Sequence, residues 1–133
     1  MEQLPSINLI HLLIDSSGGI MSVDNSISIN MYYDMAEKMI ADGKAWLVEE
    51  DWQNAFVIFL RLINLIHYTI PSHSSFEDIR YRKQKYLWCR RELENKLMDN
   101  LEYILIHVRK SGGNTYRAHE SSDRDYLLPS KVN

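Results

Sequence analysis

The sequence predicts an all-α fold: a three-helix bundle with a short N-terminal helix before it and an overlong third helix. Three segments, residues 32–47, 52–66 and 86–108, repeat apolar side chains every three or four positions, which is the period of a helix buried on one face. Glycine pairs and a proline separate the segments from their surroundings. The 133 residues, 45% of them hydrophobic, suffice for one domain with a real core.

The first 22 residues contain an apolar run over residues 7–14, followed by Asp15, two serines, Gly18 and Gly19. A short helix fits this run. The glycine pair can end that helix and act as a flexible joint, since glycine adopts the left-handed conformation that helix ends use.

The first bundle helix is expected after Ser28, whose hydroxyl suits an N-cap. Its stripe is Tyr32, Ala36, Met39, Gly43 and Trp46. Gly43 costs about 1 kcal/mol relative to alanine inside a helix. We therefore expect a neighbouring helix to approach closely there.

The second helix is expected from the acidic stretch at Glu50 and Asp51 to Pro71, where proline ends it. It is apolar almost all round, with a narrow polar strip of Asn54, Arg61 and Asn64. Such a helix must be covered on more than one side. It is therefore either the central element of the bundle or partly covered by a partner.

The third helix is expected from Phe76 or Glu77 to Lys110, some 34 residues or roughly 50 Å. The first bundle helix reaches only about 30 Å. The third helix must then overhang the bundle, bend, or pair with another chain. The predicted organisation is a short helix and joint in residues 1–22, the bundle in 23–110 and a disordered tail in 111–133.

Several protein classes do not fit this composition. The formal net charge of −3 argues against a nucleic-acid binder. The single cysteine, Cys89, excludes an internal disulfide, and the reducing cytoplasm is the expected compartment. The N-terminus lacks the basic residues of a secretory signal. The most apolar stretch, residues 55–70, is interrupted by polar residues and is too short for a transmembrane segment, so it is interpreted as a buried helix.

The residue pattern contains no catalytic machinery. The five histidines form no H-x-H or H-x-x-x-H pair, so neither a zinc site nor another metal site is predicted. Cys89 lies in mid-helix without a glycine-rich turn to expose it, and an inert thiol is favoured over a nucleophile activated by Arg90 and Arg91. Neither glycine pair has the strand and lysine of a phosphate loop. No cofactor is expected.

Three features point instead to protein binding. Residues 80–96 are rich in lysine and arginine, which is either a solvated helix face or an attraction for an acidic partner. Aromatic residues are frequent; most are expected to pack in the core, and any that stay exposed would anchor a partner. Grooves between the helices of a bundle can also hold a helix or an extended peptide.

Three segments resemble a known family: residues 23–33 (VDNSISINMYY) with Ala36 and Ile40, residues 49–58 (EEDWQNAFVI) and residues 69–73 (TIPSH). Together they resemble the N-terminal region of AMSH-type deubiquitinases, over roughly residues 20–108. A related ubiquitin-specific protease shares this region as a dimerisation domain, and it is similar to MIT (microtubule-interacting and trafficking) domains. The resemblance implies an MIT-like bundle that binds tails of ESCRT-III subunits or self-associates.

The leading functional hypothesis is a non-catalytic module that recruits a deubiquitinase, or its regulator, from the cytoplasm to ESCRT-III on endosomes by binding tail peptides in a groove. The alternative is a homodimerisation module of a deubiquitinase. An enzyme in its own right and an unrelated scaffold are further alternatives. Since the catalytic domain of AMSH-type proteins lies far C-terminal, the chain is expected to be a fragment, a short isoform or a stand-alone regulator. The residues predicted to line the groove are Tyr86, Arg90, Leu93 and Leu97.

Overall fold

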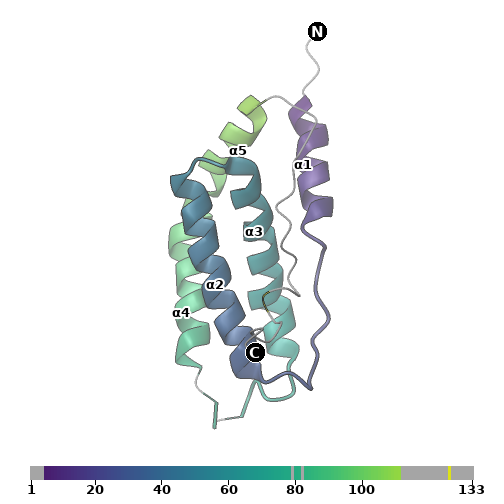
Figure 1. The fold of residues 1–133 in the computed structure, drawn as a ribbon, viewed down its shortest axis with the longest axis vertical. Coiled ribbons are helices and arrows are strands. Elements are labelled where there is room, and N and C mark those ends of the chain that lie inside the picture. The colour runs from purple at the N-terminus through teal and green to yellow at the C-terminus, as the bar shows by residue number, and fades with distance from the viewer. Residues whose placement is uncertain (1–4, 79, 82, 112–125, 127–133) are drawn as a thin grey trace, which may run out of the picture.

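The computed structural model describes residues 5–78, 80, 81, 83–111 and 126, with the side chains of 5–10, 96–98 and 111 left out. It confirms the all-α prediction, since every regular element in the described part of the chain is helical. The α-helices are α1 (Pro5–Ser16), α2 (Ile29–Val48), α3 (Trp52–Asn64), α4 (Gln84–Glu92) and α5 (Leu101–Ser111). In Figure 1, α2, α3 and α4 run side by side along the long axis, and α1 lies at the α5 end.

Helix α1 ends where the glycine pair predicts. Gly18 and Gly19 have φ of 85° and 71°, the left-handed region in which an L side chain is strained. Arg61 of α3 donates from Nε to the Ser17 carbonyl at 3.3 Å and from Nη2 to the Ser16 carbonyl at 3.3 Å. A cation at the negative end of a helix is favourable. Arg61, predicted to be part of a polar strip, therefore joins α3 to the C-terminus of α1.

The predicted starts of the first two bundle helices agree with the structure. Ser28 is the N-cap of α2, and its hydroxyl accepts a hydrogen bond from the Asn30 N–H at 3.2 Å. Asp51 is the N-cap of α3 and accepts from the Asn54 N–H at 3.1 Å. Between α2 and α3 the chain turns at Glu50, whose φ is 59°. Local side-chain chemistry thus sets both starts.

The central position predicted for the second helix is confirmed, because α3 contacts α1, α2 and α5. Its run continues through a π-helical turn, Leu65–Thr69, and a 3₁₀ turn, Ile70–Ser72. Pro71 therefore lies inside the last turn rather than ending the helix. By length and composition Trp52–Ser72 could cross a membrane, but 56% of its most apolar window is buried in the bundle, and a core helix passes the same test.

The π-helical turn leaves one carbonyl without a helical donor. The Ile70 N–H donates to the Leu65 carbonyl, so the next donor in this i to i+5 pattern would come from residue 71 to the Ile66 carbonyl. Residue 71 is proline and has no N–H. The buried hydroxyl of Tyr86 donates to the Ile66 carbonyl at 2.9 Å instead. Tyr86 thereby ties the third helix to the end of the second.

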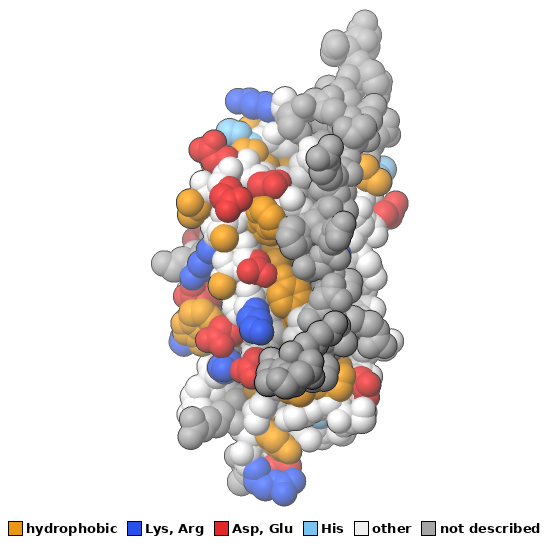
Figure 2. Space-filling view, in the orientation of Figure 1, with side chains coloured by type: hydrophobic (Ala, Val, Ile, Leu, Met, Phe, Trp, Pro, Cys, Tyr) orange, Lys and Arg blue, Asp and Glu red, His pale blue; other side chains and the backbone are white. Residues whose placement is uncertain are grey.

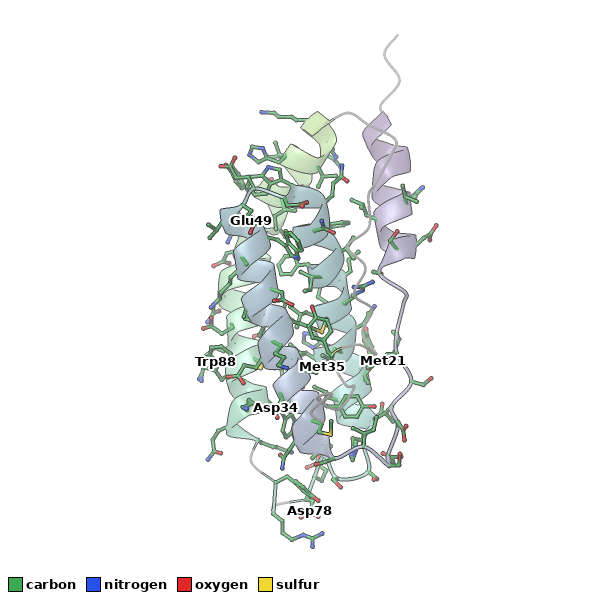
Figure 3. All side chains as sticks on the ribbon, viewed as in Figure 1. Met21, Asp34, Met35, Glu49, Asp78 and Trp88 are labelled. Atoms are coloured by element: carbon green, nitrogen blue, oxygen red, sulfur yellow. The ribbon has the colours of Figure 1, made fainter. Side chains whose placement is uncertain are left out.

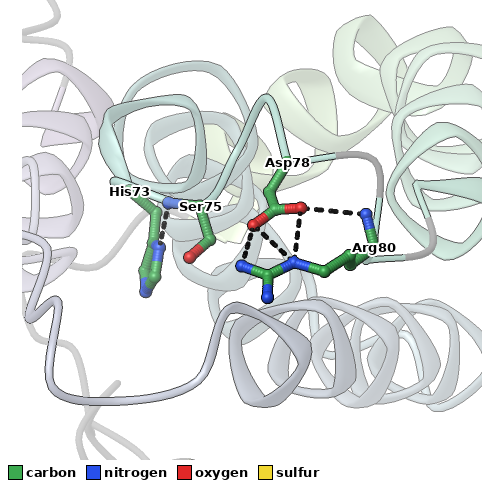
Figure 4. A network of polar contacts seen from close by, with 4 residues as sticks. All are labelled: His73, Ser75, Asp78 and Arg80. Carbon is green, nitrogen blue, oxygen red and sulfur yellow. Dashed lines mark hydrogen bonds and ion pairs between the residues drawn. The ribbon is translucent and has the colours of Figure 1, made fainter.

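The predicted start of the third helix at Phe76 or Glu77 is wrong: α4 begins at Gln84. Side chains in the connection hydrogen-bond to the local backbone and so compete with a helix (Figure 4). The Ser75 N–H donates to His73 Nδ1 at 3.0 Å, and the Arg80 N–H donates to Asp78 Oδ1 at 2.9 Å. Hydrogen bonds from the Arg80 side chain lower the pKa of Asp78 to about 2.

The helical segment over residues 84–111, called here the third helical run, packs against different helices along its length. It passes from α4 through a π-helical turn, Leu93–Leu97, and a 3₁₀ turn, Met98–Asn100, into α5. Helix α4 packs on α2, whereas α5 packs on α3 and α1. Figure 1 shows α5 leaning toward α1. The third helical run is longer than the first bundle helix because its two halves, α4 and α5, cover different sides of the core.

Most of the predicted tail lies outside the described residues. Ser111, the first residue of the predicted tail, is the last residue of α5. Tyr126 is also described: its hydroxyl donates to Asp42 Oδ2 at 2.5 Å, and its side chain packs against the core.

Replacing Tyr86 by phenylalanine is expected to lower the free energy of unfolding by about 1–3 kcal/mol, because the buried Ile66 carbonyl loses its donor. Urea unfolding followed by circular dichroism measures this. Tyr68→Phe is the matched control, because Tyr68 is exposed; it should change stability by less than about 0.5 kcal/mol. Equal effects of the two substitutions would contradict the role given to the Tyr86 hydroxyl.

Candidate functional site

The described residues contain no group of three or more His, Cys, Asp or Glu side chains that could hold a metal ion. His73, a buried histidine, is engaged within the fold: its Nδ1 accepts from the Ser75 N–H, so its Nε2 carries the proton and donates to the Ile27 carbonyl at 2.7 Å. These two hydrogen bonds hold the ring in place, so that His73 links the segment just before α2 to the connection that follows residue 72.

Cys89 is a core residue and not a nucleophile. It lies in α4 with no exposed surface. Burial first, and then the nearby Glu37 carboxylate, raises the pKa of its thiol to about 12. A thiol that keeps its proton at neutral pH cannot act as the thiolate of a cysteine protease.

The residues predicted to line a groove lie in different environments. Tyr86 is 5% exposed and Leu93 is fully buried. Arg90 is on the surface, where its Nε is 3.3 Å from Glu94 Oε2. The side chain of Leu97 lies outside the described residues. The stripe from which they were chosen faces the core, because the most regular apolar repeat of a helix is the one it buries. Their role in binding a partner stays a prediction.

Arg90 and Tyr86 nevertheless border a surface hollow of about 460 Å³ between α4 and the end of the second helical run. Phe76 and Tyr86 meet edge to face there, with ring centroids 5.2 Å apart. The Lys83 ammonium lies 4.1 Å from the Phe76 ring centroid. No acidic side chain is among its lining residues, which are His67, Pro71, Phe76, Lys83, Tyr86, Leu87 and Arg90. We call this hollow, with its apolar floor and cationic rim, the basic groove.

The lysine- and arginine-rich stretch is largely neutralised by neighbouring carboxylates. Lys85 pairs with Asp34 and Glu37 of α2, and Arg80 pairs with Asp78. Figure 2 shows acidic, basic and hydrophobic side chains intermixed over the edge of the molecule where α4 lies. Arg91 differs from these cations, because it is exposed and makes no ion pair with the described residues. A broad basic patch therefore does not form on the described surface.

The outer face of the third helical run was not predicted from the sequence. Four large apolar side chains are exposed there: Leu87 (51%), Trp88 (37%), Tyr103 (51%) and Ile106 (43%). Figure 3 shows Trp88 at the outer edge of α4. Tyr103 also contacts Trp52 and His107, with ring centroids 5.2 and 4.3 Å away. Helical spacing could have revealed this face, since residues 88, 91, 95, 99, 103 and 106 repeat every three or four positions opposite the buried stripe.

Comparison with protein families gives a match over residues 6–111 to the family described as the USP8 dimerisation domain. Comparison with curated proteins and with solved structures gives no match.

The Cys89 thiol is expected to react with a thiol reagent only when the chain unfolds. In the unfolded chain the thiol titrates near its ordinary pKa of about 8.5, whereas the folded state keeps it protonated up to about 12. As the pH rises above the unfolded value, the unfolded state loses this proton first, so the contribution of Cys89 to stability falls. Labelling rates with and without urea, at neutral and alkaline pH, measure this. Stoichiometric labelling of the folded chain at neutral pH would contradict it.

Proposed function

From the premise that the chain belongs to the family of the USP8 dimerisation domain, we propose that it joins two copies of a deubiquitinase, or of a regulator of one, as a homodimer. The match over residues 6–111 carries this proposal. It favours the dimerisation module, which the sequence placed second, over recruitment by tail peptides, which it placed first. The matched region is a non-catalytic dimerisation domain.

The described structure is consistent with a role in protein contacts. The Cys89 thiol is buried in the core, which raises its pKa, so it does not serve as a nucleophile at neutral pH. The third helical run exposes large apolar side chains at Leu87, Trp88, Tyr103 and Ile106. Large apolar and aromatic side chains on a protein surface are typical anchors of protein–protein contacts.

Sedimentation of the 133-residue chain at several concentrations is expected to show a monomer–dimer equilibrium, with the dimer predominant at tens of micromolar. The weight-average mass should rise toward twice 15.7 kDa as the concentration increases. A mass that stays at the monomer value throughout this range would refute homodimerisation.

We propose recruitment to ESCRT-III on endosomes as a second function, exerted by a chain that starts in the cytoplasm. The basic groove supports it, since its apolar floor suits a peptide that presents apolar anchors. Its rim cations Lys83 and Arg90 are held in surface ion pairs with Glu77 and Glu94, and an acidic peptide would exchange for those carboxylates. Trp88, Tyr103 and Ile106 do not line the basic groove and remain available for dimerisation, whereas Leu87 belongs to both surfaces.

Titration of labelled ESCRT-III tail peptides tests this second function. Binding should saturate with a dissociation constant in the high micromolar range, and Arg90→Glu should weaken it several-fold by reversing a charge at the rim. Arg109→Glu is the matched control, because Arg109 is exposed on α5 and does not line the groove. Absence of saturable binding, or equal weakening by both substitutions, would contradict the proposal.

A further inference from the structure

We propose that Tyr126 is a site of tyrosine phosphorylation and that a phosphate on its hydroxyl releases this residue from α2. The hydroxyl donates to Asp42 Oδ2 at 2.5 Å, although the two residues are 84 positions apart in the chain. Tyr126 lies outside residues 6–111, so this contact is not part of the region that matches the dimerisation family. The site is therefore separate from the proposed homodimer and from the basic groove.

The contact between Tyr126 and α2 requires an uncharged phenol. The ring packs against the hydrophobic core, and the side chain stays partly exposed. The hydroxyl donates its proton to the Asp42 carboxylate, which makes this a charge-assisted hydrogen bond. Asp42 thus binds Tyr126 as a donor, and the phenolic oxygen stops being a donor when it carries a phosphate.

The sequence before Tyr126 suits a tyrosine kinase. Asp123 and Asp125 lie three and one positions before it, with Arg124 between them and Glu120 further back. Kinases select substrates partly by complementary charge, so acidic residues ahead of a tyrosine suit a kinase with a basic peptide cleft. Of the eight tyrosines in the sequence, Tyr126 alone has two acidic residues among the three preceding positions.

Phosphorylation turns this hydrogen bond into a repulsion. In the kinase, the Tyr126 oxygen attacks the γ-phosphorus of ATP and forms a new P–O bond. The bond from that phosphorus to the bridging oxygen breaks, ADP leaves, and the phenolic proton passes to the base of the kinase. The product carries nearly two negative charges at neutral pH and no longer donates to Asp42. Two like charges at this separation repel.

One neighbouring cation opposes the repulsion without outweighing it. The positions three or four residues from Asp42 are its neighbours on the surface of α2, and only Lys38 among them is charged. Lys38 is exposed, and an ion pair at an exposed lysine contributes little. The phosphate and the Asp42 carboxylate together leave an excess of negative charge beside this one cation, so release is expected.

The hydroxyl reaches a kinase when Tyr126 leaves α2 transiently. Such a local opening costs less free energy than global unfolding, because most of the core stays packed. The kinase modifies the open form, and the phosphate then prevents the return to Asp42. Phosphorylation therefore shifts the population toward the released form and exposes the part of α2 that Tyr126 covers.

Treatment of the 133-residue chain with ATP and a purified tyrosine kinase that accepts glutamate–tyrosine copolymers tests the site. Peptide mass spectrometry should place a phosphate on Tyr126, at a rate comparable with that of a synthetic peptide of residues 119–129, and Tyr126→Phe should remove it. Tyr33 is the internal comparison, since it is buried and should stay unmodified. A chain that stays unmodified at Tyr126 overturns the proposal.

The amide resonance of Tyr126 in ¹⁵N NMR spectra measures the release. Phosphorylation should move this resonance to the position that it has in the free phosphopeptide. With Asp42→Lys, the phosphorylated residue should keep its docked position, because the introduced ammonium pairs with the phosphate. Glu102→Lys is the matched control, a reversal of charge at an exposed residue of α5, and should respond like the unchanged chain.

Two results would overturn the release of Tyr126. One is a resonance that keeps its docked position after phosphorylation of the unchanged chain. The other is the same movement in the chains with and without Asp42→Lys. The remaining resonances report that each variant folds. None of these measurements depends on the oligomeric state, so they leave the test of homodimerisation by sedimentation independent.

Discussion

The structure depends on the need to bury the second helical run, Trp52–Ser72, which is apolar on nearly every side. A helix with one apolar stripe needs one neighbour, whereas this run needs several. Helices α1, α2 and α5 meet its first part, and α4 meets its last turns. Removing apolar surface from water is the dominant favourable term in folding, so the remaining helices take the positions that cover this run.

That demand also determines how the third helical run is used. One straight helix cannot lie against both α2 and the far side of α3, so the run passes through a π-helical and a 3₁₀ turn between α4 and α5. The same wide-turn geometry at the end of the second run leaves the Ile66 carbonyl without a backbone donor, and Tyr86 supplies one. The buried polar groups there are satisfied across helices rather than within them.

Function is consequently left to the outer surface. The most regular apolar stripe of the third helical run, with Tyr86, Cys89 and Leu93, is buried in the core. Burial also keeps the Cys89 thiol protonated and inaccessible. What remains exposed is a face with apolar side chains at its ends and charged side chains between them, next to the basic groove beside α4. The family to which the chain belongs is described as a dimerisation domain, which agrees with a role exerted through this surface.

The sequence by itself determined the helical class, the N-cap at Ser28, the start of the second helix at its acidic stretch, and the stop at Gly18 and Gly19, because hydrophobic period and capping chemistry act within a few residues. Only the tertiary structure decided that the third helix starts at Gln84 and which of its faces stays exposed. The late start follows from the local bonds of His73 and Asp78, with His73 also held by the Ile27 carbonyl, whereas the exposed face depends on which helices pack against the run. A repeat of apolar side chains marks a face for burial, but what covers it is settled by packing in three dimensions.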